Sequence, residues 1–244
     1  MRLTFASYNI HKGIGLDRRR DPQRILRVLE ELKADVVALQ EADRRFGDRA
    51  ATLSDADLRE RTGLVPVALA DGEAGSGWHG NTILLPPDAT IHAAERINLP
   101  FLEPRGAILV EFENDAAPVR LVATHLGLTR GMRQAQLQAI IEATAARDSM
   151  PTILAGDFNE WSTSSGFEAL QGRFQIVSPG RSFHSARPLA ALDRIGLTPG
   201  ITLRDAGVHE TPLSRMASDH LPVWAELGLP PPGDAVWSKG GPDV

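Results

Sequence analysis

The sequence predicts an α/β fold in a single domain, and three observations lead to this prediction. Short apolar runs without alternation, such as Asp35–Glu41 and Pro151–Ala155, are typical of strands buried on both faces. Segments in which apolar residues recur at helical spacing lie between such runs. The chain has 244 residues, a length at which α/β folds are commonly one unit.

The N-terminal part predicts a strand, a helix and a second strand. Residues 3–10 are rich in apolar and β-prone side chains and end on an Asn-Ile-His-Lys-Gly turn. Asp21 followed by Pro22 is a helix start signal, and five apolar residues then recur at helical spacing, which predicts a helix over 22–33. Asp35–Glu41 follows as a buried strand with a carboxylate at its exit.

The middle of the chain predicts mostly strands. Ser54 is a cap for a short helix that reaches about Thr62. Strand-like runs follow at 64–69 and 81–85, and the glycine-rich loop between them, 71–80, is expected to be mobile. Three further runs, at 90–98, 106–113 and 119–124, are separated by turn-forming residues and predict an antiparallel meander.

The C-terminal part contains a helix, a buried strand and weaker patterns. Residues 134–146 are helix-prone, and the strand at 151–155 ends in Gly156-Asp157-Phe158-Asn159. Residues 172–207 read as short pieces, and 220–227 predict a final strand with Pro222 at its start or edge. We expect a catalytic domain over 1–228 and a poorly ordered, proline- and glycine-rich tail over 229–244.

Composition limits the classes of function. A net charge of −5 and a pI near 5.8 argue against binding nucleic acid over a long stretch through whole-molecule electrostatics. The absence of cysteine leaves only oxygen or imidazole ligands for a metal. The N-terminal residues run directly into a strand, which favours a cytoplasmic location, and no run approaches the roughly 20 apolar residues of a membrane span. Peripheral lipid contact stays open.

Polar residues able to bind a metal or transfer protons follow four of the apolar runs. They are Asn9, Glu41, His125 and the pair Asp157 and Asn159, and Asp219-His220 opens the last predicted strand. Neighbouring strands bring their ends together, so these groups are expected to converge at one rim of a sheet. Carboxylate and amide oxygens suit Mg²⁺ or Mn²⁺, and histidines could donate hydrogen bonds to a phosphate.

The order of these residues and their neighbours along the chain resembles the endonuclease/exonuclease/phosphatase superfamily of metal-dependent phosphoesterases. The resemblance extends over most of the chain. Seven short motifs carry the resemblance: Tyr8-Asn9-Ile10, Leu39-Gln40-Glu41, Gly80-Asn81-Thr82-Ile83-Leu84, Thr124-His125-Leu126, Gly156-Asp157-Phe158-Asn159, Leu192-Asp193-Arg194-Ile195 and Ser218-Asp219-His220. The resemblance implies a four-layer α/β sandwich, in which two mixed β-sheets pack face to face with helices outside.

The resemblance also implies roles for individual residues. Asn9, Glu41 and Asp219 would hold the metal, Mg²⁺ or alternatively Mn²⁺. Asp157 would activate the attacking water, and Asn159 would orient water or phosphate. His125 would contact a non-bridging phosphate oxygen, and His220 would assist the leaving group. Asp193 would bind the imidazole of His220 and set its tautomer.

Three further residues are expected to bind substrate. Lys12 and Arg105 lie beside glycine-containing turns and could contact phosphate, and Asn81 could form a wall of the site. Two of the assigned residues have a simpler alternative. Asn81 is a structural residue about as readily, and Asp193 could pair with Arg194. Trp161 and Trp78 could stack on a base, rest on lipid or pack in the ordinary way.

The sequence therefore predicts a divalent-metal-dependent hydrolase of phosphate esters, a phosphodiesterase acting on nucleic acid or nucleotides. A phosphomonoesterase or a phospholipid head-group hydrolase is the alternative within enzymes. A non-catalytic protein that binds a phosphate ligand is the alternative from another class. The chain is expected to act as a monomer.

Overall fold

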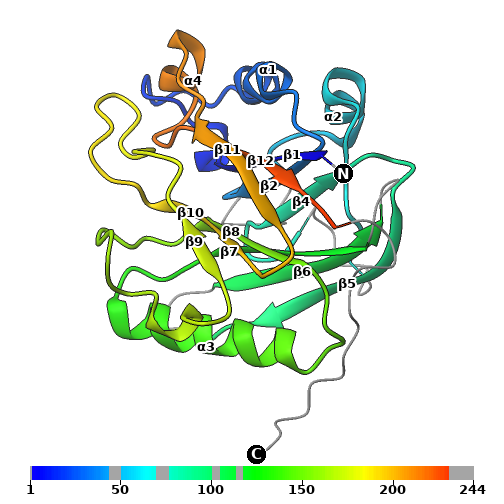
Figure 1. The fold of residues 1–244 in the computed structure, drawn as a ribbon. Helices are drawn as coiled ribbons and strands as arrows, with labels where there is room; N and C mark the ends of the chain where they lie inside the picture. The colour runs from blue at the N-terminus through cyan, green and yellow to red at the C-terminus, as the bar shows by residue number, and fades with distance from the viewer. Residues whose placement is uncertain (1, 44–50, 70–76, 101–104, 114–117, 231–244) are drawn as a thin grey trace, which may run out of the picture.

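The computed structural model has four layers, with two six-stranded β-sheets in the middle and helices on the outside (Figure 1). It describes residues 2–43, 51–69, 77–100, 105–113 and 118–230. This is the α/β sandwich that the resemblance implied, so that prediction is confirmed. Within the described residues no helix is long and apolar enough to cross a bilayer.

The first sheet combines strands from both ends of the chain. Its strand order is β11-β12-β1-β2-β4-β3, and only β1 and β2 are parallel. The strands are β1 (Arg2–Asn9), β2 (Val36–Gln40), β3 (Val65–Pro66), β4 (Thr82–Leu85), β11 (Thr202–Val208) and β12 (Val223–Gly228).

The second sheet comes from the middle of the chain, in the order β5-β6-β7-β8-β10-β9, and only β7 and β8 are parallel. Its strands are β5 (Thr90–Asn98), β6 (Gly106–Glu113), β7 (Val119–His125), β8 (Thr152–Asp157), β9 (Gln175–Val177) and β10 (Asp193–Leu197). The predicted antiparallel meander is β5-β6-β7 and is confirmed.

Helices cover the outer face of each sheet. The first sheet carries α1 (Pro22–Leu32), α2 (Asp55–Thr62) and α4 (Pro212–Ala217), and the second carries α3 (Arg130–Ala145). The start of α1 follows the predicted signal, since the carboxylate of Asp21 accepts a hydrogen bond from the backbone N–H of Arg24. Two short 3₁₀ turns, His11–Gly13 and Glu168–Leu170, complete the set.

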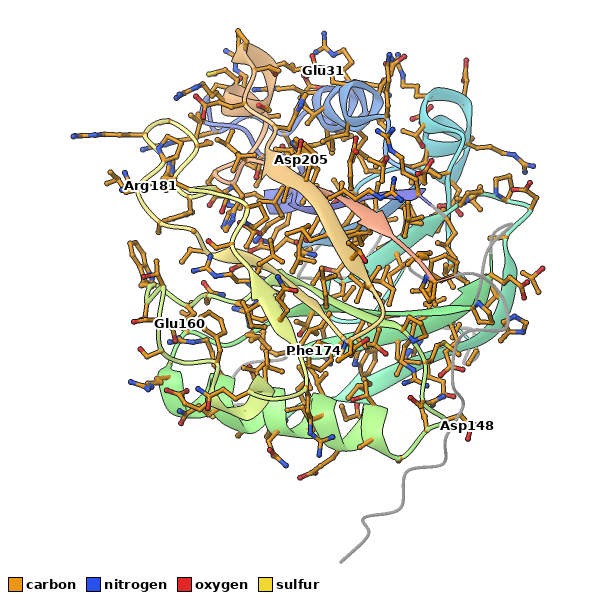
Figure 2. All side chains as sticks on the ribbon, viewed as in Figure 1. Glu31, Asp148, Glu160, Phe174, Arg181 and Asp205 are labelled. Carbon is orange, nitrogen blue, oxygen red and sulfur yellow. The ribbon has the colours of Figure 1, made fainter. Side chains whose placement is uncertain are left out.

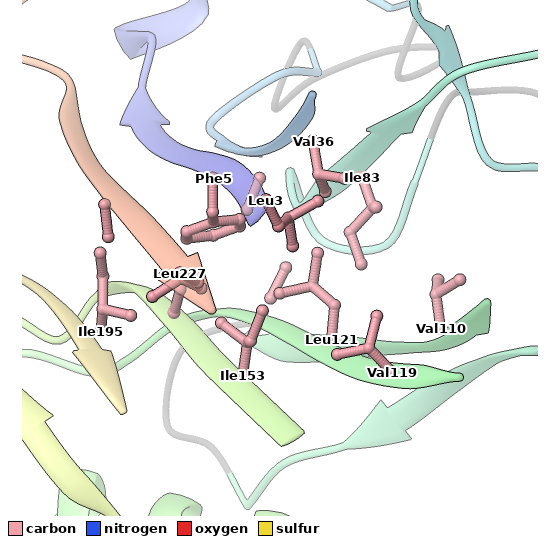
Figure 3. Packing of buried hydrophobic residues seen from close by; sticks show 14 of the residues in the cluster. Leu3, Phe5, Val36, Ile83, Val110, Val119, Leu121, Ile153, Ile195 and Leu227 are labelled. Carbon is pink, nitrogen blue, oxygen red and sulfur yellow. The ribbon is translucent and has the colours of Figure 1, made fainter. Parts of the chain in front are cut away.

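The main core lies between the two sheets (Figure 3). Apolar side chains from one sheet meet those of the other, and the figure shows the first group as Leu3, Phe5, Val36, Ile83 and Leu227, and the second as Val110, Val119, Leu121, Ile153 and Ile195. Both sheets are also covered by helices, so their central strands are buried on both faces. Burial on both faces explains why the sequence of these strands does not alternate.

Each sheet is built around one parallel pair, β1–β2 in the first sheet and β7–β8 in the second. Helix α1 connects β1 to β2, and α3 connects β7 to β8, as parallel neighbours require a crossover. The two parallel pairs face each other across the core, with β1 and β2 against β8 and β2 against β7. We call β1–β2 and β7–β8 the central pairs.

Several predicted boundaries were wrong. Helix α3 begins at Arg130, four residues before the predicted start, with Thr129 as its N-cap residue. Gly131 weakens the helical pattern in the sequence, so the predicted start was too late. The run at 64–69 pairs regularly only at Val65–Pro66. The last strand begins at Val223, because Pro222 has no N–H for the ladder and Leu221 donates its N–H to Ser182 instead.

Two elements were not predicted, and two predictions concern residues outside the described part. Strand β11 is a largely exposed edge strand, so it lacks an apolar run, and α4 is only six residues long. Leu229, the first residue assigned to the tail, is buried in the core between the sheets. Residues 231–244 of that tail lie outside the described residues. So do residues 71–76 of the predicted glycine-rich loop.

Replacing Leu121 by alanine should lower the free energy of unfolding by about 2–5 kcal/mol, because Leu121 is fully buried between the sheets and its loss leaves a cavity. Ile91→Ala is the matched control in the same sheet, because Ile91 is 45% exposed, and it should change the free energy by about 0.5 kcal/mol or less. Urea denaturation measures both. Equal losses in the two variants would contradict this account of the core.

Candidate active site

The predicted site residues begin at the carboxyl ends of the central pairs. Asn9 ends β1, Glu41 directly follows β2, His125 ends β7 and Asp157 ends β8. The amide nitrogen Nδ2 of Asn9 donates to Oδ2 of Asp157 at 3.1 Å, although 148 positions separate the two residues. The facing of the central pairs therefore brings together strand ends of both sheets, whereas the sequence analysis expected these groups at one rim of a single sheet.

Asp157 lies at the centre of this group and is 1% exposed. Its Oδ2 is 3.4 Å from Nε2 of His125 and 3.5 Å from Nε2 of His220. Its Oδ1 accepts a hydrogen bond from the backbone N–H of Asn159 at 2.9 Å. Asn159 in turn has a positive φ of 49° and donates its side-chain amide to the carbonyl of Leu126, which fixes the turn after β8.

His220 lies against Asp193, the residue that was expected to bind its imidazole. Nδ1 of His220 and Oδ2 of Asp193 are 2.9 Å apart, and the hydroxyl of Ser182 donates to the same oxygen. Burial lowers the pKa of His220, but the charges of Asp193 and Asp157 outweigh it and raise the pKa from 6.5 to about 10. The imidazole is therefore a cation between two carboxylates at neutral pH.

His125 has the opposite charge state. Burial lowers its pKa from 6.5 to about 4, and the charge of Asp157 opposes this effect only in part, while Arg105 adds to it. His125 is therefore neutral at neutral pH and able to donate one N–H. Two histidines beside one carboxylate thus differ in charge because their other neighbours differ, an arrangement typical of sites that move protons.

Glu41 sits in a left-handed backbone conformation with φ 52°, directly after β2. Its carboxylate is paired with Nζ of Lys12, one of the predicted substrate-binding residues. Burial raises the pKa of Glu41, but two effects outweigh it and lower the pKa from 4.5 to about 2. They are the contact with Lys12 and the charge of His125, which is protonated in the acid range in which Glu41 titrates. A left-handed glutamate is strained, so the surrounding contacts must hold it.

The last predicted ligand, Asp219, is joined to Asn9 through Ser218. The hydroxyl of Ser218 lies 2.7 Å from the backbone oxygen of Asn9 and 3.3 Å from Oδ1 of Asp219. The same Oδ1 is 3.7 Å from Nδ1 of His11. These contacts place Asp219 beside the first sheet, at the edge where Asn9 ends.

Asn81 has a structural contact in this arrangement. It is fully buried, and its amide nitrogen donates to the carbonyls of Gly106 and Trp78. The preceding Gly80 lies against the backbone of Glu41, where an added Cβ would come within 3.2 Å of its Cα. Asn81 thus supports the turn that packs on Glu41, and its predicted role in substrate binding stays a prediction.

Sequence reasoning missed the buried charges behind the turn after Asn159. Arg133 of α3 contacts Glu160 at 2.7 Å, and both side chains are buried. Arg194 is 1% exposed and donates to the carbonyls of Asp193 and Ser162 at 3.3 and 3.4 Å, so Asp193 pairs with His220 rather than with the Arg194 side chain. His11 also lies beside the site, since its backbone N–H donates to Oδ1 of Asn9 and its ring lies 3.7 Å from Asp219.

The donor set fits a hard divalent cation bound with water. Glu41 is ionised, Asn9 accepts only one hydrogen bond on its amide oxygen among the described residues, and Asp219 is partly exposed. A cationic Lys12 already lies against Glu41, so positive charge is favoured there. In the described ranges no three His, Asp or Glu side chains form a closed metal cluster.

Comparison with known proteins adds independent information. Residues 6–220 match the sequence model of the Endonuclease/Exonuclease/phosphatase family. "Uncharacterized protein YbhP" of Escherichia coli K12 is 27% identical over 241 residues, covering 91% of this chain and 94% of its own.

Two solved structures share the fold. The Bacteroides thetaiotaomicron mannosyl-6-phosphatase Bt3783 is 19% identical, covers 93% of this chain and 100% of its own, and has a TM-score of 0.73. The D. rerio TDP2 complex with single-strand DNA product is also 19% identical, covers 93% and 99%, and has a TM-score of 0.69.

Asp193→Asn should lower the pKa of His220 by more than one unit, because it removes the charge that does most to raise it. NMR titration of the imidazole in the metal-free protein measures this change. A raised pKa in the folded state stabilises the protein below about pH 6.5, and this contribution is lost as the pH rises toward 10. The variant should therefore lose less stability than the wild type over that window, and an unchanged His220 pKa would contradict the pairing.

Proposed function

The chain belongs to the endonuclease/exonuclease/phosphatase family, and from this we propose that it is a divalent-metal-dependent phosphodiesterase acting on nucleic acid or nucleotides. The observation that supports this most is the position of the Asp157 carboxylate. It is buried within 3.1–3.5 Å of Asn9, His125 and His220, where the carboxyl ends of both central pairs meet.

In this proposal Asp157 is the base. Water beside Oδ2 would transfer a proton to it as the water oxygen attacks phosphorus and the bond to the leaving-group oxygen breaks. Asn159 holds Asp157 through its backbone N–H, and Asn9 holds it through its side-chain amide, so the carboxylate has one orientation. A fixed, buried base needs little reorganisation at the moment of reaction.

The two histidines would act on the phosphate. His220 would donate a hydrogen bond to the leaving-group oxygen, with Asp193 fixing its ring through Nδ1. His125, at the end of β7 on the other side of Asp157, would donate to a non-bridging oxygen. Arg105 and Lys12 would add positive charge for the phosphate, since Arg105 acts electrostatically on His125 and Lys12 on Glu41.

Glu41, Asn9 and Asp219 would hold the metal, Mg²⁺ or Mn²⁺. The bound ion would supply Lewis-acid stabilisation of the charge that develops on the phosphate. Oxygen ligands from carboxylate and amide groups are those that such ions prefer.

The substrate class is the finer part of the proposal. The family relatives named above include a sugar phosphatase and a protein bound to a DNA product, so both monoesters and diesters occur on this fold. The net charge of −5 favours a small substrate over long nucleic acid. A phosphomonoesterase or phospholipid head-group hydrolase is the alternative, distinguished by monoester turnover or vesicle binding.

Asp157→Asn should reduce kcat/KM for bis(4-nitrophenyl) phosphate by about 10²–10⁴-fold, because it removes the base while keeping the shape of the side chain. Asp148→Asn is the control, since Asp148 is exposed on the loop before β8 and should leave the rate unchanged. Circular dichroism and melting temperature check the fold of each variant. Full activity of folded Asp157→Asn would remove Asp157 from the mechanism.

Glu41→Gln should raise the Mg²⁺ concentration for half-maximal activity by about 10- to 100-fold or more. Removing a residue that only supports a metal ligand already weakens metal affinity by that factor, and Glu41 is proposed to be a ligand itself. Glu142→Gln, on the exposed face of α3, is the matched control. Turnover by the wild type that persists in chelator would refute metal dependence. A folded wild type without metal-dependent turnover on diesters and monoesters would favour the non-catalytic phosphate-binding alternative.

A further inference from the structure

A row of three rings leads from the predicted catalytic histidine to the surface. Phe183 packs on His220 with ring centroids 4.9 Å apart and an interplanar angle of 50°. Trp161 meets Phe183 edge-on, with centroids 6.1 Å apart and an angle of 82°. His220 is 4% exposed whereas Trp161 is 64% exposed, so the row runs from the buried site to solvent. We call the two outer residues of this row, Trp161 and Phe183, the aromatic row.

Phe183 is held by its backbone on both sides. Its N–H donates to the carbonyl of Ala190, and its carbonyl accepts from the N–H groups of Ala190 and Leu189 at 2.8 and 2.7 Å. It also forms an isolated β-bridge with His220. Phe183 is thus fixed to the residue that lies 3.5 Å from the Asp157 carboxylate.

Trp161 is held by its neighbours in the chain although its ring is exposed. The preceding Glu160 is buried in the ion pair with Arg133, and the following Ser162 donates its N–H to Glu160 at 2.9 Å. The carbonyl of Ser162 lies 3.4 Å from the guanidinium of Arg194. Figure 2 shows Glu160 and Arg181, which are close in sequence to Trp161 and Phe183, on the same side of the molecule.

An exposed indole on a fixed turn beside the catalytic histidine is preorganised for binding. A loop that had to become ordered would add a conformational-entropy cost to binding, but the backbone of this turn is already held by hydrogen bonds. The turn after Trp161 is polar, because Ser164 and Ser165 donate to the hydroxyl of Ser162. A polar, hydrogen-bonded turn is suited to water rather than to the interior of a lipid bilayer.

We propose that the aromatic row is a subsite for an aromatic ring in the leaving group of the substrate, such as a nucleobase or a phenyl group. The inference rests on the proposed function, in which His220 faces the leaving-group oxygen. The group attached to that oxygen lies next to Phe183 and reaches the exposed face of Trp161. Stacking on tryptophan is tolerant of ring identity, so the subsite selects flat rings rather than one particular base.

The test compares two non-hydrolysable ligands, phenylphosphonate and cyclohexylphosphonate, bound to the Mg²⁺-loaded protein in titration calorimetry. They differ in whether the ring is flat and aromatic. The wild type should bind the phenyl compound more tightly, and Trp161→Ala should weaken phenyl binding about 5- to 150-fold, the loss of one stacking contact. The loss for the cyclohexyl compound should be several times smaller.

Two further variants make the comparison specific. Trp161→Phe should keep most of the preference for the phenyl ligand, because it keeps a π-face. Leu128→Ala is the matched control, since Leu128 is 62% exposed but lies outside the aromatic row, and it should leave both dissociation constants unchanged. Phenylphosphonate should also protect the wild type from acrylamide quenching of tryptophan fluorescence, and should give less protection in Trp161→Phe.

Equal losses for the two ligands in Trp161→Ala would overturn the inference, as would an unchanged preference. Loss of binding to phosphatidylglycerol vesicles in Trp161→Ala with an intact ring preference would overturn it too, and would identify Trp161 as a lipid contact. Because binding is measured without turnover, these outcomes are separate from a failure of the proposed function. That failure appears as absent metal-dependent hydrolysis by the wild type.

Discussion

The structure depends on the face-to-face packing of two parallel strand pairs. Parallel neighbours point their carboxyl ends the same way, and the helix that connects them must return along the outside of the sheet. The central pairs β1–β2 and β7–β8 meet this requirement with α1 and α3 on opposite outer faces. Packing them through the apolar core brings Asn9 and Asp157 into hydrogen-bond contact.

Convergence of these strand ends creates an electrostatic problem that the neighbouring residues solve. Asp157 and Asp193 are nearly inaccessible, and burying unpaired carboxylates would cost several kcal/mol each. The cationic His220 lies between them, and Lys12 pairs with Glu41. The pairing with Asp193 and Asp157 leaves His220 charged, whereas burial leaves His125 neutral.

The sequence predicted the parts that follow local rules. Strands β2 and β8 are apolar runs because both of their faces are covered, and Asp21-Pro22 starts α1 as expected. Edge strand β11 was missed because an exposed strand carries no apolar run. The Glu160–Arg133 pair could not be predicted either, since it joins a loop to a helix 27 positions away and no local pattern records such a contact.

The contrast between strand ends, which the sequence predicted, and loop contacts, which it did not, also separates the proposed reaction from its selectivity. Asn9, His125 and Asp157 stand at strand ends, so the packing of the sheets positions them. Trp161 and Phe183 stand on loops, and their positions depend on contacts such as Glu160 with Arg133 and Phe183 with Ala190. Under the proposed subsite, changes in those loops would alter which leaving group fits without moving Asp157 or His125. The same fold occurs in a protein named as a mannosyl-6-phosphatase and in one solved with a single-strand DNA product, as expected where loops rather than sheets differ.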